Sequence, residues 1–297
     1  MMATSLPVWR SLLYVPVINP RFVEKAAGSG ADAVILDLED SVPPSEKDRA
    51  RTLLANASRE AARGGADIVV RVNRPWRLLV RDLEATIIAG VAALALPKVE
   101  SAEHAQAIAE IVGELESERG LAPGSVRLLA MIETAAGFFR IEAIARSHPR
   151  VVALTIGAED LALSLGMLPE AEGLFYPNQQ AVFAARAAGI LPLGFIGTVA
   201  EYKDLAAFRA TVQRSRRLGF MGAACIHPSQ IGILNEAFAP SGEEVRRAER
   251  MVAAYDAAIA DGRGAVEFEG RMIDIPVVER ARQTLERAAA IRARRSG

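Results

Sequence analysis

Residues 30–42 read GADAVILDLEDSV, in which a short apolar run leads directly into Asp37, Glu39 and Asp40. A near-continuous apolar run is typical of a parallel strand that is covered on both faces. Carboxylates this close in sequence repel one another unless a cation lies near them. The stretch therefore predicts a buried strand whose carboxyl end carries an acidic site.

The same pattern recurs along the chain, where short apolar runs alternate with stretches that are compatible with helices. The predicted strands are residues 12–16, 33–39, 68–73, 93–97, 127–133, 151–157, 191–196 and 223–227. The helix-compatible stretches include residues 20–28, 45–65, 102–120 and 202–219. Strands that alternate with helices indicate βαβ units, and eight such units match the size of a TIM barrel. A doubly wound open sheet is the competing fold, but no G-x-G-x-x-G motif follows any of these strands. We therefore predict an α/β fold, a TIM (β/α)8 barrel.

The chain continues beyond the eighth predicted strand for longer than a barrel needs. Helical patterns cover residues 243–264 and 277–295, and Pro240 followed by Ser241 and Gly242 marks a candidate boundary. We predict a catalytic barrel domain over residues 1–240 and a C-terminal helical extension over residues 241–297.

Composition narrows the possible partners and the cellular location. The chain has 297 residues, of which 51% are hydrophobic, and a formal net charge of −1. A chain without a basic surplus is not expected to bind nucleic acid. We see no apolar stretch long enough for a membrane span, and no signal peptide. The single cysteine, Cys225, excludes a disulfide framework and fits a cytoplasmic location.

Polar residues stand at the ends of most predicted strands, where TIM barrels carry their active sites. Besides the acids of the opening stretch, Glu133 and Asp160 each follow an apolar run. Five carboxylates around one barrel mouth need a counter-charge. Oxygen ligands without a cysteine cluster or a histidine pair favour Mg²⁺ over zinc, so we predict a Mg²⁺ site with Glu133 and Asp160 as ligands.

Several roles stay open at this point. Asp37 could pair with an arginine, and Arg71 could be an ordinary ion-pair partner of the acids. Lys98 at the end of the fourth strand could form a Schiff base in a metal-independent aldolase. His227 could serve structure or chemistry.

Taken together, these segments resemble the citrate lyase beta-subunit-like proteins of the HpcH/HpaI aldolase family, whose members include malyl-CoA and citramalyl-CoA lyases. The segments that carry the resemblance are RSLLYVP (10–16), ADAVILDLEDSV (31–42), VRVN (70–73), LPKVE (96–100), MIETAAG (131–137), GAEDLA (157–162), LGF…CIHPSQI (218–231) and GRMIDIP (270–276). The resemblance spans nearly the whole chain. It implies a TIM barrel, Mg²⁺, a CoA-thioester substrate, and a homotrimer or dimer of trimers.

The resemblance also assigns roles to individual residues. Glu133 and Asp160 match the metal ligands of the family, and Arg71 matches its active-site arginine. Glu39 and Asp40 match an acidic pair just outside the metal.

Further residues are matched outside this centre. Asp274 matches an aspartate that a C-terminal lid delivers into the site of a neighbouring subunit. Arg21 and Lys25 lie where relatives contact CoA phosphates, and Lys98 is a further candidate for substrate binding.

The expected reaction is a reversible Claisen-type cleavage of a β-hydroxyacyl-CoA, such as malyl-CoA or citramalyl-CoA, to acetyl-CoA and a 2-oxoacid. Arg71 would stabilise the enolate oxygen, and Asp274 is the candidate acid or base. The backbone N–H groups of Ala135 to Gly137 could hold the substrate carboxylate at a helix N-terminus. The alternatives are a malyl-CoA thioesterase or malate-synthase-like activity, the Lys98 Schiff-base aldolase, and a thioester-binding beta subunit of a citrate lyase complex.

Overall fold

The computed structural model describes residues 6–198, 203–262 and 264–296. The chain divides into two compact units, Met1–Phe238 and Ala239–Gly297. Among the described residues, no helix is both long and apolar enough to cross a membrane.

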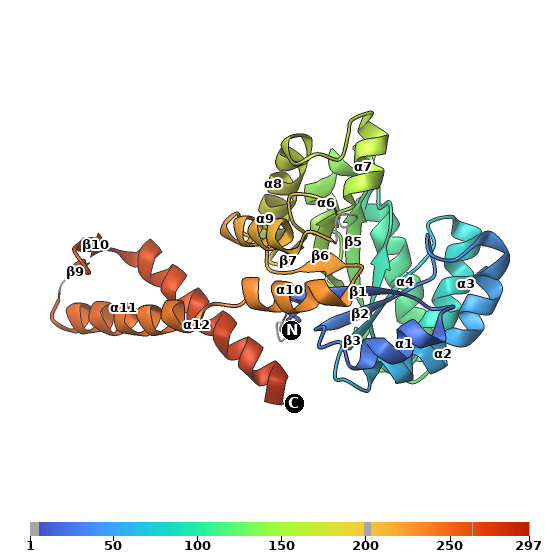
Figure 1. The fold of residues 1–297 in the computed structure, drawn as a ribbon, viewed down its shortest axis with the longest axis horizontal. Coiled ribbons are helices and arrows are strands. Elements are labelled where there is room, and N and C mark those ends of the chain that lie inside the picture. Colours follow the sequence, from blue (N-terminus) through green and yellow to red (C-terminus); the bar gives the residue numbers. More distant parts are fainter. Residues whose placement is uncertain (1–5, 199–202, 263, 297) are drawn as a thin grey trace. The chain divides into compact units, whose positions relative to one another are not determined.

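The first unit is built around an eight-stranded parallel sheet in the order β7-β6-β5-β4-β3-β2-β1-β8, surrounded by helices (Figure 1). Its strands are β1 (Ser11–Pro16), β2 (Ala33–Asp37), β3 (Asp67–Arg71), β4 (Val91–Leu96), β5 (Arg127–Ile132), β6 (Val151–Ile156), β7 (Leu191–Leu193) and β8 (Ala223–Cys225). A single parallel bridge from Leu193 to Gly222 joins the two ends of this order. The eight strands thus form a nearly closed barrel, and the predicted TIM fold is confirmed.

Helices and short 3₁₀ turns connect the strands. They are α1 (Pro20–Ala27), η1 (Pro44–Glu46), α2 (Lys47–Ala62), α3 (Trp76–Thr86), α4 (Ala102–Glu118), α5 (Ala135–Phe138), α6 (Ile141–Ala145), α7 (Ala158–Leu165), α8 (Ala171–Ala188), α9 (Leu205–Arg217), η2 (Pro228–Gln230) and α10 (Ile231–Ala237). The sequence patterns had indicated α1, α2, α4 and α9, whereas α3, α7 and α8 were not among the named stretches.

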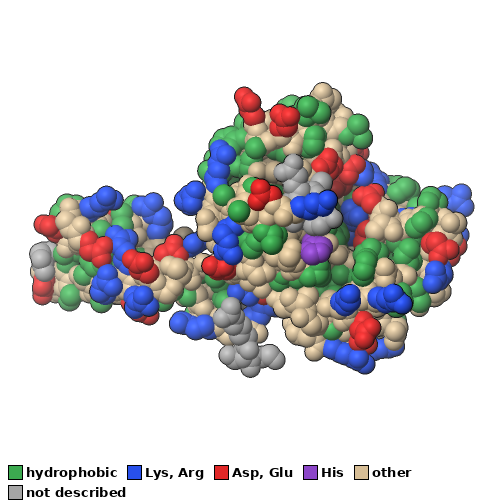
Figure 2. Space-filling view, in the orientation of Figure 1, with side chains coloured by type: hydrophobic (Ala, Val, Ile, Leu, Met, Phe, Trp, Pro, Cys, Tyr) green, Lys and Arg blue, Asp and Glu red, His purple; other side chains and the backbone are tan. Residues whose placement is uncertain are grey.

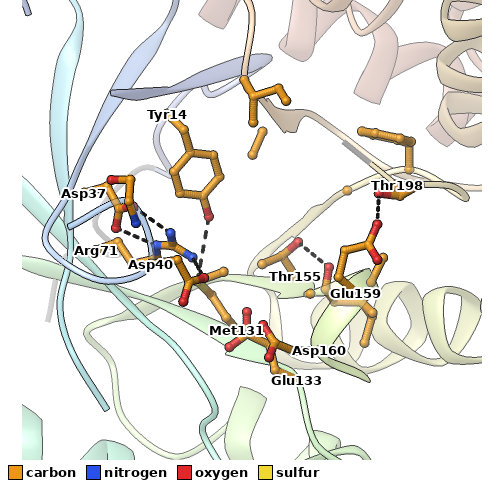
Figure 3. Close-up of a pocket in the computed structure, with 18 of the residues that line it drawn as sticks. Tyr14, Asp37, Asp40, Arg71, Met131, Glu133, Thr155, Glu159, Asp160 and Thr198 are labelled. Atoms are coloured by element: carbon orange, nitrogen blue, oxygen red, sulfur yellow. Dashed lines mark hydrogen bonds and ion pairs between the residues drawn. The ribbon is translucent and has the colours of Figure 1, made fainter. Parts of the chain in front are cut away.

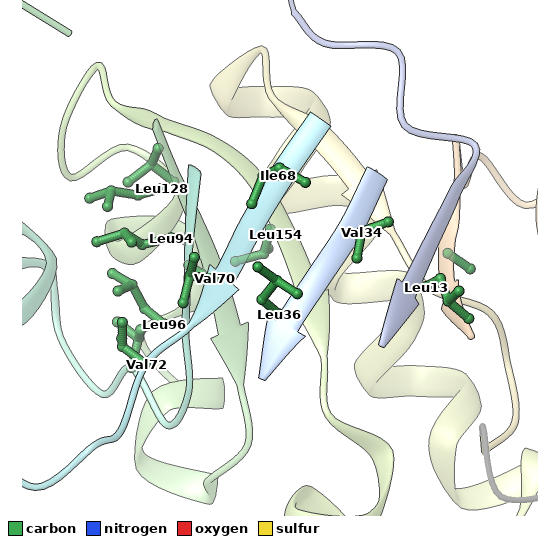
Figure 4. Packing of buried hydrophobic residues seen from close by; sticks show 14 of the residues in the cluster. Leu13, Val34, Leu36, Ile68, Val70, Val72, Leu94, Leu96, Leu128 and Leu154 are labelled. Carbon is green, nitrogen blue, oxygen red and sulfur yellow. The ribbon is translucent and has the colours of Figure 1, made fainter. Parts of the chain in front are cut away.

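Alternate residues of each strand enter two different apolar layers, because successive strand side chains point to opposite faces. Val34 and Leu36 of β2 pack outward with residues of neighbouring strands and helices (Figure 4). Ala33 and Ile35 of the same strand pack inside the barrel, together with Val69 of β3. Both layers are apolar, which explains why the strands read as continuous hydrophobic runs.

A buried ion pair fixes the lower end of the barrel. Glu116 of α4, 1% exposed, accepts hydrogen bonds from Arg150 at 2.6 and 2.8 Å and from the backbone N–H groups of Gly124 and Val126, both at 2.8 Å. Burial by itself would raise the pKa of Glu116, but these donors lower it to about 2.

The ion pair between Glu116 and Arg150 predicts that the free energy of unfolding decreases in acid. The native pKa of Glu116 lies below its ordinary value of 4.5, so its stabilisation is present above pH 4.5 and is lost as the pH falls toward 2. We expect Glu116→Gln to cost about 3 kcal/mol at pH 7 and less than half of that near pH 3, because at pH 3 the unfolded chain protonates Glu116 while the native carboxylate is still ionised. Urea unfolding of both proteins at pH 7, 5 and 3 measures the difference, and a cost that does not change with pH would contradict the prediction.

The second unit consists of α11 (Gly242–Ala260), a hairpin of β9 (Val266–Phe268) and β10 (Arg271–Ile273), and α12 (Ile275–Ser296). α11 begins at a capping box in which Ser241 and Glu244 bond each other's backbone N–H groups. The helices and the hairpin share a small apolar cluster of their own: Ala248, Met251, Tyr255, Ile273, Val278 and Ala281. The described hairpin was not foreseen in the stretch 265–276.

Charged side chains of both signs are interspersed over the visible surface of each unit (Figure 2). This mixture agrees with the net charge of −1.

Candidate functional site

The strand alternation places one set of polar side chains inside the barrel at its C-terminal end. Inward positions on β2 and β3 continue from Ile35 to Asp37 and from Val69 to Arg71, and these last two residues are register partners on neighbouring strands. By the same alternation, Leu129 and Met131 of β5 face inward, and Glu133, two positions further along the chain, continues this series. In a TIM barrel this end carries the active site.

A cavity of about 550 Å³ opens at this end of the barrel (Figure 3). Its polar wall includes Tyr14, Asp37, Asp40, Ser41, Arg71, Glu133, Thr155, Glu159, Asp160 and Thr198. Apolar side chains, among them Met131, Phe195 and Ile226, complete the wall. A cavity of this size with a few converging polar groups is the usual form of a small-molecule site.

Arg71 is the centre of the hydrogen-bond network in this cavity. Its Nε and Nη2 atoms donate to the two carboxylate oxygens of Asp37, both at 2.7 Å. Its Nη1 atom lies 2.9 Å from Glu39 Oε2 and 3.1 Å from Asp40 Oδ2. The guanidinium also lies over the ring of Tyr14, 4.9 Å from the ring centre. Such anchoring fixes the orientation of the planar fork.

Asp37 both holds Arg71 and shapes the loop that follows β2. Its carboxylate accepts hydrogen bonds from the backbone N–H groups of Glu39, at 2.9 Å, and Ser41, at 3.1 Å. Burial by itself would raise the pKa of Asp37, but the hydrogen bonds and charge of Arg71 hold it below its ordinary value. The structure shows the ion pair of Asp37 with an arginine that the sequence had left open, and it places Asp37 in the cavity wall.

Glu133 and Asp160 come together in the same cavity from the ends of β5 and β6. Figure 3 shows their side chains next to each other on the cavity wall. Glu133 Oε2 accepts the backbone N–H of Lys98 at 2.8 Å, and Asp160 Oδ1 lies 3.2 Å from Lys98 Nζ. Burial, followed by repulsion from Asp160 and Glu39, raises the pKa of Glu133 to about 7 despite the charge of Lys98. A buried carboxylate of this kind is stabilised in its ionised form by a bound cation.

Gly157 explains how Glu133 can lie so close to β6. A β-carbon at residue 157 would stand 2.4 Å from Glu133 Oε1 and 2.5 Å from Glu133 Cγ, so no other residue type fits without moving the carboxylate. Gly157, the first residue of the GAED segment, thus leaves room for the proposed ligand Glu133. The last residue of the same segment, Asp160, is the other proposed ligand.

The charge balance and the donor atoms at this mouth suit Mg²⁺. Six carboxylates, those of Asp37, Glu39, Asp40, Glu133, Glu159 and Asp160, lie at this mouth with three cations: Lys47, Arg71 and Lys98. When all are ionised, the six negative and three positive charges leave three negative charges without compensation. Among the described residues, no three acidic, histidine or cysteine side chains form a ready metal cage. Mg²⁺ commonly takes only one or two protein carboxylates and completes its shell with water and substrate oxygens. The carboxylates of Glu133, which is buried, and Asp160, which is half-buried, are hard oxygen donors that fit it.

Other residues that the sequence had singled out lie outside the cavity wall. Glu39 is buried behind it, whereas Arg21 and Lys25 are exposed on α1. Phe22 of the same helix does line the cavity. Asp274 is exposed in the second unit, at the start of α12.

Two of the backbone donors proposed at residues 135–137, those of Ala135 and Gly137, are already engaged. The Ala135 N–H donates to Ser164 Oγ at 3.0 Å, and the Gly137 N–H donates to Thr134 Oγ1 at 3.1 Å. Neither residue lines the cavity, so a role in holding the substrate carboxylate gains no support from the geometry. His227 caps the η2 turn by accepting the N–H of Ser229, which is a structural role.

Sequence reasoning gave no role to five polar residues of the wall: Tyr14, Ser41, Thr155, Glu159 and Thr198. Tyr14 lies two positions after Leu12, which faces inward, so strand alternation alone could have found it. Thr155 follows from Ala153 of β6 by the same rule. Strand alternation does not indicate Glu159, because this residue lies in α7. Its carboxylate accepts a hydrogen bond from Thr198, which lies after β7 and is distant in the sequence.

Comparison with known proteins identifies the family of the chain. The model of the HpcH/HpaI aldolase/citrate lyase family matches residues 10–228. The chain belongs to the HpcH/HpaI aldolase/citrate lyase family. The resemblance noted in the sequence is confirmed, and residues 10–228 include every residue of the cavity wall.

Individual relatives extend over almost the whole chain. The citrate lyase subunit beta of Escherichia coli (strain K12) is 36% identical over 284 residues, covering 94% of this chain and 93% of that protein. A (3S)-malyl-CoA thioesterase of Cereibacter sphaeroides is 36% identical over 296 residues, covering 98% and 99%. Among solved structures, protein CitE from Mycobacterium tuberculosis in complex with magnesium, acetoacetate and coenzyme A is 32% identical. It aligns with a TM-score of 0.72 and covers 94% of this chain and 97% of that one.

Proposed function

We propose that this chain is a magnesium-dependent carbon–carbon lyase that cleaves a β-hydroxyacyl-CoA, such as malyl-CoA or citramalyl-CoA, to acetyl-CoA and a 2-oxoacid. The observation that carries the proposal is the convergence of two carboxylates, the buried Glu133 and the half-buried Asp160, with an anchored guanidinium, Arg71, on one cavity. The CitE relative that was solved with magnesium, acetoacetate and coenzyme A supports this assignment.

Glu133 and Asp160 would hold the metal. When bound, Mg²⁺ supplies Lewis-acid polarisation of the substrate's hydroxyl and carboxylate oxygens. Glu39 and Asp40 would add negative charge that favours a bound cation, and they keep Arg71 in place through their ion pairs with it. The acidic stretch after β2 would thereby serve both the cation and the arginine.

Arg71 would stabilise the oxygen of the enolate that forms when the carbon–carbon bond breaks. Its five N–H groups meet four carboxylate contacts in the described structure, which leaves one N–H on Nη2 for a substrate oxygen. A preorganised donor of this kind is worth about 3 kcal/mol in the transition state.

The second unit would act as a lid that carries Asp274 into the site of a neighbouring subunit of a homotrimer, or of a dimer of trimers. Its hairpin and two helices have an apolar cluster of their own, and Asp274 is exposed at the end of the hairpin. Asp274 would then exchange a proton with the acetyl carbon or the hydroxyl. Arg21 and Lys25, exposed on the helix that carries the wall residue Phe22, would contact CoA phosphates.

The geometry speaks against the Schiff-base alternative. Burial lowers the pKa of the Lys98 ammonium, but Glu133, Glu39 and Asp160 together raise it above its ordinary value. A protonated amine that is paired with two carboxylates is a poor nucleophile.

Thioester hydrolysis is a second candidate, favoured by the 36% identity to a (3S)-malyl-CoA thioesterase. In that reaction the thioester bond breaks and malate and free CoA are released together.

One assay separates these functions. Purified protein is incubated with malyl-CoA or citramalyl-CoA, with Mg²⁺ or with EDTA, and the products are separated by chromatography. We expect acetyl-CoA and glyoxylate or pyruvate, formed only with Mg²⁺. Release of free CoA together with malate would show that the chain is a thioesterase and not a lyase. Binding of the thioester without any turnover would instead indicate a non-catalytic beta subunit.

A further inference from the structure

Lys98, in the loop after β4, connects acids that come from opposite parts of the barrel mouth. Its Nζ atom lies 3.4 Å from Glu39 Oε1, after β2, and 3.2 Å from Asp160 Oδ1, after β6. The Lys98 side chain is 30% exposed, so it is not sealed in the interior. One flexible cation therefore bridges a proposed metal ligand and a carboxylate behind it.

The backbone of Lys98 is held in an uncommon conformation. Its φ of 51° lies in the left-handed region, which residues with a β-carbon rarely adopt. The conformation directs the Lys98 N–H onto Glu133 Oε2 at 2.8 Å, while the next N–H, of Val99, donates to Met131 O at 3.2 Å. Such strain persists only where the surroundings impose it. The loop thus directs both the amide and the ammonium of one residue to the two proposed metal ligands.

An ammonium at this place competes with a divalent cation for the same oxygen. Asp160 Oδ1 is a proposed ligand, and the ion pair with Lys98 already occupies it in the described structure. Without Lys98 the neighbouring carboxylates of Glu39, Glu133 and Asp160 would repel one another. The lysine therefore stabilises the protein without metal, and the same charge opposes the arrival of Mg²⁺.

We propose that Lys98 is a positioning residue that acts as the resident counter-cation of the metal site and releases Asp160 when Mg²⁺ binds. The inference rests on the proposed function only in that Glu133 and Asp160 bind the metal. It requires no Schiff base and no contact between Lys98 and the substrate.

The test is the Mg²⁺ affinity of Lys98→Met, measured at pH 8 by isothermal titration calorimetry, with thermal unfolding recorded with and without Mg²⁺. We expect Mg²⁺ to bind the variant at least about tenfold more tightly, because a positive charge within a few ångströms of the ion has been removed. The unfolding temperature without metal should fall, and its increase on adding Mg²⁺ should exceed that of the wild type. A residue with only a structural role would weaken metal binding when replaced.

Two further variants make the result decisive. Lys98→Gly removes the same charge and also the left-handed strain, so it should bind Mg²⁺ more tightly even if Lys98→Met folds poorly. Lys203→Met, at an exposed lysine, should leave the affinity unchanged. Equal or weaker affinity in both Lys98 variants would overturn the inference. If the wild type itself fails to bind Mg²⁺, the proposed function fails instead, and the two failures are distinguishable.

Discussion

Replacing Glu133 by glutamine is expected to abolish magnesium-dependent turnover, by more than about 1000-fold, while the barrel remains folded. The amide keeps the shape of the side chain but removes one of two carboxylates that would hold the metal. Burial, with repulsion from Asp160 and Glu39, raises the pKa of Glu133 to about 7. Because the native pKa lies above the ordinary value of 4.5, the ionised form costs native stability at higher pH. The metal-free variant should therefore unfold at a temperature equal to or above that of the wild type at pH 8.

Mg²⁺ titration and thermal unfolding at pH 8 measure both parts of this prediction. Glu142→Gln is the matched control, because it makes the same chemical change at an exposed position of α6. The control should keep wild-type affinity and turnover. Retention of Mg²⁺ binding and turnover in Glu133→Gln would exclude Glu133 as a ligand, and with it the proposed chemistry.

The barrel could be predicted because each strand has a recognisable sequence pattern of its own, which does not depend on the other strands. Each strand is apolar on both faces, and the run ends where polar residues begin, so periodicity and length suffice. Helices such as α3 and α8 gave weaker patterns: Pro75 starts α3 without a side-chain cap, and α8 contains Pro177 in its interior. Proline is expected to interrupt a helix, and here the surrounding packing overrides that tendency.

The site was partly predictable for the same reason. The pair of Asp37 and Arg71 follows from strand alternation and from the order of neighbouring strands, both of which the sequence contains. The contacts of Lys98 do not follow, because they depend on a left-handed backbone at a lysine, which no local pattern indicates. The engagement of Ala135 and Gly137 by Ser164 and Thr134 was equally invisible, since one partner lies in another helix.

Replacing Arg71 by methionine is expected to lower both activity and stability. Turnover should fall about 100-fold to 1000-fold, since the donor to the developing enolate oxygen is lost. The free energy of unfolding should fall by about 3 kcal/mol, because Asp37, 2% exposed, keeps its carboxylate but loses its bidentate partner. Without the guanidinium the pKa of Asp37 should rise, so the loss of stability should be larger at pH 8 than at pH 5.

The double variant Arg71→Met with Asp37→Asn separates the two effects. Neutralising Asp37 removes the unpaired buried charge, so urea unfolding should show most of the lost stability restored. Turnover should stay as low as in Arg71→Met, because the amide cannot supply the missing donor at the place of the guanidinium. The stability of Arg71→Lys should lie between that of Arg71→Met and that of the wild type. An ammonium keeps the charge but cannot bond both oxygens of Asp37 in the fork geometry. If the double variant recovered turnover together with stability, Arg71 would act only by holding the loop after β2, and the enolate would need another donor.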